Sequence, residues 1–128
     1  KLGTTLYAPF TGTIDRVAGT LTANIPAFVP INMLAAPGGA THFKIVSAGA
    51  EVDFENETFV MDAQATAVLP WDATATAVIN LANTVTANST KPLFLALGIE
   101  FYQEVNGQMY PLKNGAYNAL ALVKVSGL

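Results

Sequence analysis

Residues 93–104 alternate between apolar and other side chains without a break, and this stretch constrains the fold more than any other. One set of alternate positions holds Leu95, Leu97, Ile99 and Phe101, and the other holds Ala96, Gly98, Glu100, Tyr102 and Glu104. Side chains of a β-strand point alternately to its two faces, so a period of two predicts a long strand with one buried face. A helix would repeat its apolar positions at intervals of three or four. The chain is therefore expected to build its core on a β-sheet.

The rest of the chain indicates shorter strands between turn residues. Runs of β-branched and aromatic residues are separated by Gly, Pro and Asn, and Asn106-Gly107 is a strong signal for a tight hairpin turn. The predicted strands cover residues 11–17, 20–25, 41–54, 58–65, 75–85, 93–104, 108–112 and 116–125, after a short run at 4–8. About eight strands at this spacing predict an all-β fold, an antiparallel β-sandwich of immunoglobulin-like or jelly-roll type.

Two irregularities are expected within this pattern. Pro30 favours a helical turn over residues 31–35, because proline suits the first position of a helix. The next strand is long, and we expect a bulge in it at Gly49. Its inward-facing set begins with Phe43 and ends with Phe54, and one extra residue between them is what brings both side chains to the same face.

Length and charge limit the classes of function. The 128 residues fit a single domain, spanning 1–128, and contain no cysteine, which excludes disulfides and thiolate metal sites. The formal net charge is −3, Arg16 is the only arginine, and the lysines are scattered. Nucleic-acid binding needs a basic face, so this class of partner is excluded. No apolar run reaches the ~18–20 residues of a membrane-spanning helix, so no membrane insertion is expected.

No set of residues forms a recognisable catalytic or metal site. His42 is the only histidine, whereas nucleophilic catalysis and metal centres need partners at a fixed spacing. The acidic turn at 53–57 lacks the spacing of a calcium-binding loop. Glu100 and Glu104 lie ~13 Å apart along one strand face, which is too far for a glycosidase pair. We therefore expect no enzyme activity, no cofactor and no metal.

Sparse charge favours a role in assembly. Only 12% of the residues are charged, against roughly 25% in an average soluble domain, and the cores of protein interfaces are depleted in charge. Both chain ends are apolar and strand-like, and terminal strands are readily exchanged between neighbours. The sequence thus predicts a non-enzymatic structural module, a subunit of a larger assembly such as a surface appendage, filament or coat. Its partner would be protein, either copies of itself or homologous subunits. The residues expected to dock on a neighbour are Leu2, Leu6, Tyr7 and Phe10.

A carbohydrate-binding or adhesin-type domain is the alternative. Aromatic rings suit the flat apolar surfaces of sugars, and the candidates for such a platform are Trp71, Tyr102, Tyr110 and Tyr117. Tyr102 and Tyr110 flank the Asn106-Gly107 turn and are expected to be neighbours across it. A glycan is thus the alternative partner, and an extracellular or cell-surface location suits both hypotheses.

The stretch GIEFYQEVNGQMYPLKNGAYNALALVKV, from Gly98 to Val125, resembles the C-terminal end of a family of Bacteroidetes-type proteins of unknown function. The steps Ala8-Pro9-Phe10 and Gly39-Ala40-Thr41-His42 match the same family. Its members are longer chains with a separate N-terminal region, so the resemblance implies that this is the C-terminal domain of a longer bacterial protein. The absence of an initial methionine agrees with that expectation. The shared motifs belong to hairpins and strands, and the resemblance implies no function.

Overall fold

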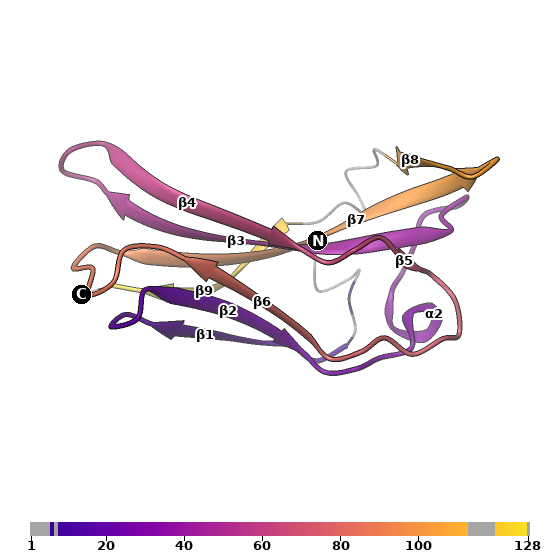
Figure 1. The fold of residues 1–128 in the computed structure, drawn as a ribbon, viewed down its shortest axis with the longest axis horizontal. Coiled ribbons are helices and arrows are strands. Elements are labelled where there is room, and N and C mark those ends of the chain that lie inside the picture. Colours follow the sequence, from indigo (N-terminus) through magenta and orange to yellow (C-terminus); the bar gives the residue numbers. More distant parts are fainter. Residues whose placement is uncertain (1–5, 7, 113–119, 128) are drawn as a thin grey trace.

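A computed structural model of the chain describes residue 6, residues 8–112 and residues 120–127. It shows an antiparallel β-sandwich made of two packed sheets, as predicted (Figure 1). The smaller sheet contains β1 (Thr11–Asp15), β2 (Thr20–Ile25) and β6 (Ile79–Thr84), in the order β1-β2-β6. In the part of the chain that is described, no helix is long and apolar enough to span a membrane.

Within the described residues, the larger sheet contains six strands. These are β3 (His42–Asp53), β4 (Thr58–Ala65), β5 (Leu69–Pro70), β7 (Leu93–Val105), β8 (Gln108–Leu112) and β9 (Leu120–Ser126). The main order is β4-β3-β7-β8, while β5 pairs with β3, and β9 pairs with the first half of β7. With β5 and β8 set aside, this is the immunoglobulin-like order, in which the fourth strand has joined the sheet of the third. The immunoglobulin-like alternative therefore describes the topology.

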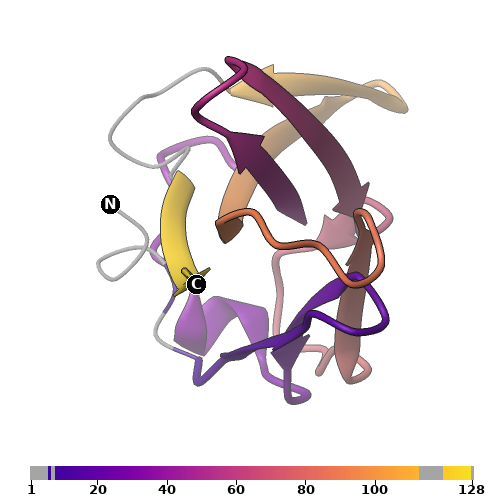
Figure 2. The ribbon, with the colours of Figure 1, turned by 90° about the vertical axis from the view of Figure 1, so that its left-hand side faces the viewer.

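Both long sides of the sandwich are closed by contacts between the sheets (Figure 2). On one side β4 runs beside β6, and the Asp62 carboxylate accepts the backbone N–H of Thr84 at 2.8 Å. On the other side β1 runs beside β9, and Arg16 donates to the backbone carbonyl of Ser126 at 2.9 Å. These contacts cover strand edges that would otherwise invite pairing with another chain.

The core lies between the sheets and centres on β3 and β7. The alternating set of β7 that includes Leu97 and Ile99 is almost completely buried, as the sequence predicts. Phe43 and Ile45 of β3 pair with this set across the sheet and are fully buried. The Asn106-Gly107 turn is also confirmed, because both residues have positive φ angles, 50° and 80°, as a tight hairpin turn requires.

The predicted bulge at Gly49 is wrong. The pairing of β3 with β7 runs without a shift from His42 to Glu51, so Gly49 keeps its inward position. A Cβ at this glycine would lie 2.8 Å from the Cβ of Asn83, so the glycine makes room for a side chain of the opposite sheet. Phe54 consequently does not point inward and is 68% exposed.

Four smaller features differ from the expected pattern. The helical turn is a short helix, α2 (Pro30–Met33), and the strand expected at 75–85 begins only at Ile79. Of the run expected at 4–8 the structure describes only Leu6 and Ala8, and an isolated bridge joins Leu6 to Leu34. The irregularity in the large sheet lies in β9, where the pairing shifts between Leu95 and Ala96 of β7.

Candidate interaction surface

The outward face of the large sheet is built from the alternate residues that do not enter the core. Residues opposite each other in an antiparallel pair share a face. The register therefore places the outward residues in rows across β4, β3, β7 and β9. One row is Met61, Ala50, Phe94 and Val125, and the next is Ala63, Ala48, Ala96 and Leu122. Ala65, Val46 and Gly98 form a third row, and Phe59 and Val52 stand at the end nearest the β3–β4 turn. We call these residues together the apolar face.

The apolar face is open to solvent at both of its long borders. Phe59 and Met61 on β4 are 67% and 59% exposed, and Leu122 on β9 is 56% exposed. Phe54 extends the face, because its ring meets that of Phe94 edge-on with centroids 6.5 Å apart. Between these large side chains the floor is made of alanine and glycine. The result is a broad surface without a charged residue in any of its four rows.

The outward face of the small sheet is polar by comparison. Its rows, read from the same kind of register, are Thr13, Thr22 and Ala82, then Thr11, Asn24 and Asn80, then Asp15, Thr20 and Thr84. Hydroxyl and amide groups of this kind are readily hydrated, so this face is stable in contact with water and needs no protein partner. The two outward faces of one sandwich thus differ sharply in chemistry.

Charged residues lie at the two ends of the apolar face. At the end away from the β3–β4 turn, the Lys44 ammonium lies 3.5 Å from the Glu100 carboxylate and 5.8 Å from the centre of the Tyr102 ring. At the turn end, the Lys91 ammonium lies 3.4 Å from the Asp53 carboxylate, and Asp53 belongs to the set that alternates with the apolar face. Lys44 and Glu100 thus form a charged border at one end of the face, and a charged rim is usual at protein interfaces.

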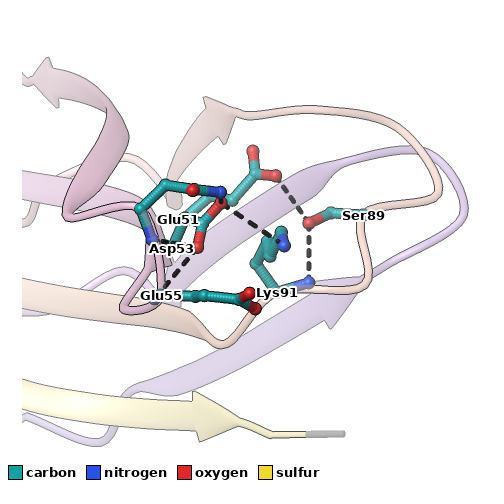
Figure 3. Close-up of polar contacts among 6 residues, drawn as sticks. Glu51, Asp53, Glu55, Ser89 and Lys91 are labelled. Carbon is teal, nitrogen blue, oxygen red and sulfur yellow. Dashed lines mark hydrogen bonds and ion pairs between the residues drawn. The ribbon is translucent and has the colours of Figure 1, made fainter.

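The turn end also contains a polar cluster, drawn in Figure 3. Glu51 is 8% exposed, and its carboxylate accepts the Ser89 hydroxyl at 2.6 Å and the Thr86 backbone N–H at 3.1 Å. The Ser89 hydroxyl, followed by the Thr86 contact, holds the pKa of Glu51 below its ordinary value. The side-chain and backbone N–H groups of Asn56 lower the pKa of Asp53 from 3.8 to about 2. Both carboxylates therefore stay charged at neutral pH.

An open pocket of about 210 Å³ adjoins this cluster and is lined by Glu51, Asp53, Thr58, Phe59, Val60 and Lys91. Its ionised groups are engaged by partners within the chain, Glu51 by Ser89 and Asp53 by Lys91. Among the described residues, no three His, Asp or Glu side chains gather in a way that would hold a metal ion. The cluster is therefore best explained as the support of the β3–β4 turn.

The residues predicted to dock on a neighbour are not gathered on an open surface. Leu6 is 3% exposed within the core of its own chain, and Phe10 packs against the same core. Leu2 and Tyr7 lie outside the described residues. The described part of the predicted docking segment is thus used inside the fold.

The aromatic residues of the alternative hypothesis do not form one platform. Trp71 packs against the core and donates from its indole N–H to the Leu34 carbonyl at 3.2 Å. Tyr102 pairs with Pro111, whereas Tyr110 pairs with Gln103. Tyr102 and Tyr110 therefore point to opposite faces, and the prediction that they are neighbours is wrong. Tyr117 lies outside the described residues.

The sequence does contain a signal for the apolar face, in β3. Val46, Ala48 and Ala50 are apolar at the positions that alternate with the buried set, so both sides of this strand carry apolar residues. Strands with that pattern are typical of sheets that are covered on both faces. The other members of the face come from β4, β7 and β9, which only the register brings together.

Comparison with known proteins identifies no relative. No family model matches the chain, and neither a curated protein nor a solved structure matches it. The resemblance of residues 98–125 to a bacterial family stays a prediction, and the function is argued from the surface itself.

Proposed function

We propose that the protein is a non-enzymatic structural module, a subunit of a larger assembly, that docks on protein through its apolar face. The observation that carries this proposal is the continuous apolar surface across four neighbouring strands, half-buried in its middle and exposed on β4 and β9, where Phe59, Met61 and Leu122 are more than half exposed. Four strands and four rows span about 19 Å by 27 Å, or about 500 Å². Patches of this size lie at the upper end for monomers and are often functional.

The strand edges of this sandwich favour docking through a sheet face over docking by strand addition. Strand addition needs a free edge, but β4 lies against β6 and β1 lies against β9. The outer edge of β8 carries Pro111, which has no backbone N–H to donate. We therefore propose docking through the apolar face in place of the strand exchange predicted from the chain ends. The carbohydrate alternative has less support, because its described aromatic residues lie on different faces.

A matched pair of substitutions tests the proposal. Ala63→Glu and Ala82→Glu each place one carboxylate on an exposed outward position of an edge strand, the first on the apolar face and the second on the polar face. Sedimentation velocity across a concentration series should show association of the wild type and of Ala82→Glu. Ala63→Glu should sediment as single chains. Wild type at single-chain mass throughout, or equal behaviour of the two variants, would contradict the proposal.

A further inference from the structure

On β4 and β7, the side chains of the apolar face become smaller with distance from the β3–β4 turn. On β4, Phe59 and Met61 stand near the β3–β4 turn, and Ala63 and Ala65 follow farther along. On β7, Phe94 lies in the same row as Met61, and Ala96 and Gly98 follow in the next two rows. On these two strands the face is therefore raised at the turn end and low at the other end, whereas β9 carries large side chains, Val125 and Leu122, in both of its rows. Two neighbouring surfaces fit only if raised parts meet low ones.

A second copy of the chain supplies such a surface when it is turned by 180° about an axis midway between the two faces. This axis is parallel to the sheets and perpendicular to the strands. This rotation keeps β4 over β4 and β7 over β7 but exchanges the two ends. Phe59 then lies over Ala65 of the second copy, and Met61 lies over Ala63. Phe94 lies over Ala96 in the same way. Because of the two-fold axis, each of these contacts occurs twice in the pair.

The charges favour the same arrangement. The turn end carries the exposed Glu55 and Glu57, and the other end carries Lys44 beside Glu100. The rotation brings Lys44 of each copy towards the acidic turn of the other. A rotation about the strand direction would instead lay β4 of one copy over β9 of the other, keep the turn ends of both faces together and place both acidic turns at the same end. Side-chain size and charge thus both disfavour this second arrangement.

We propose that the apolar face pairs with the apolar face of a second copy in a two-fold, antiparallel stack, which closes as a dimer. This inference rests on the proposed function and adds the partner and its orientation. About 500 Å² from each copy gives about 1,000 Å² in total, which reaches the lower range of specific interfaces. Aligned stacking of two sheets is also the common packing of sandwiches.

Single cysteines test the orientation, because the chain has none of its own. Phe59→Cys and Ala65→Cys change exposed side chains on β4 and should leave the fold intact. In the proposed stack these two positions face each other across sheets ~10 Å apart, whereas two copies of residue 59 are ~20 Å apart. A short bis-maleimide reagent should therefore cross-link a mixture of the two variants and leave each variant alone largely uncoupled. Circular dichroism checks that both variants are folded.

The possible results separate this inference from the proposed function. Preferential cross-linking of the mixture, lost when Ala63→Glu is added to both variants, supports the antiparallel dimer. Cross-linking of Phe59→Cys alone as efficiently as the mixture overturns the orientation, while association that depends on Ala63 leaves the docking function standing. Wild type at single-chain mass at every concentration overturns both, and a lipid or another protein would then have to cover the face.

Discussion

At Gly49 a single missing methyl group decides how closely the two sheets approach. A Cβ there would lie 2.8 Å from the Cβ of Asn83 and 3.4 Å from a methyl carbon of Leu21, both on the small sheet. The closer atom, the Cβ of Asn83, is bonded directly to the backbone of β6 and cannot move aside without it. We expect Gly49→Ala to lower the free energy of unfolding by about 1–3 kcal/mol, as overpacking of a core does.

Gly38→Ala is the matched control for this change. No atom lies within 4 Å of a Cβ at Gly38, so that variant should differ from wild type by no more than about 0.5 kcal/mol. Urea unfolding followed by the fluorescence of Trp71, the only tryptophan, measures both. Equal effects of the two substitutions would show that the sheets yield at Gly49.

Arg16 joins three separate parts of the chain. One guanidinium nitrogen donates to the carbonyls of Ser89 and Lys91 at 2.8 and 2.6 Å, and the other donates to the Ser126 carbonyl at 2.9 Å. Charge-assisted hydrogen bonds of this kind contribute about 1.5–3 kcal/mol each when buried, and less where water reaches them. We expect Arg16→Ala to destabilise the protein by about 2–3 kcal/mol in urea unfolding.

Arg16→Lys separates charge from geometry at this position. An ammonium group keeps the positive charge but lacks the planar fork that reaches carbonyls on two sides. This variant should therefore recover less than half of the lost stability. Full recovery would mean that charge alone, and not the bridging of β9 to the β6–β7 connection, explains the contribution of Arg16.

Among the elements, β3 and its turn with β4 depend on two ionised carboxylates. Glu51 has a lowered pKa because of the Ser89 hydroxyl and the Thr86 amide, and Asp53 has a pKa of about 2 because of Asn56. A lowered folded pKa gives stability that is present above the ordinary values, 4.5 and 3.8, and is lost as the pH falls through the folded values. The free energy of unfolding should therefore fall as the pH drops from about 4.5 towards 2.

Glu51→Gln tests the share of the buried carboxylate in this fall. An amide accepts hydrogen bonds through only one of its two end atoms, so the variant should be less stable than wild type at pH 7. The difference should shrink as the pH falls below the ordinary value of 4.5, because the wild-type carboxyl then also becomes neutral. Urea unfolding at a series of pH values measures it. Parallel curves for the two proteins would contradict the assignment.

The same strand shows where prediction from sequence succeeds and where it stops. The alternation in β7 and the Asn106-Gly107 turn are local patterns, and both are confirmed. In β3, Ser47 and Glu51 occupy buried positions because Asn83 and Ser89 bind them from distant parts of the chain. Sequence alone does not show these contacts, and it predicts a bulge at Gly49 because it counts Phe54 among the inward residues, where the structure leaves it exposed.

The candidate surface was harder to predict than the fold for the same reason. The predicted docking residue Leu6 is apolar because it belongs to the core of its own chain. The apolar face instead combines β4, β3, β7 and β9, whose order follows from pairing between distant segments. The sequence signal for this face is the set of alanines and valines of β3 that alternate with its buried residues. Small residues of this kind also suit a solvent-facing strand.

For the whole molecule, the contrast between the two outward faces links association to stability. A dimer that forms only from folded chains stabilises the folded state, and this effect grows with protein concentration. Each tenfold rise above the dissociation constant should add about 0.7 kcal/mol per chain and raise the Tm by about 2–4 °C. Ala82→Glu, on the polar face, should show the same rise. Ala63→Glu should unfold at one Tm at every concentration. Calorimetry over a hundredfold range of concentration measures this, and a wild-type Tm that does not change would show that the face stays uncovered by a second copy.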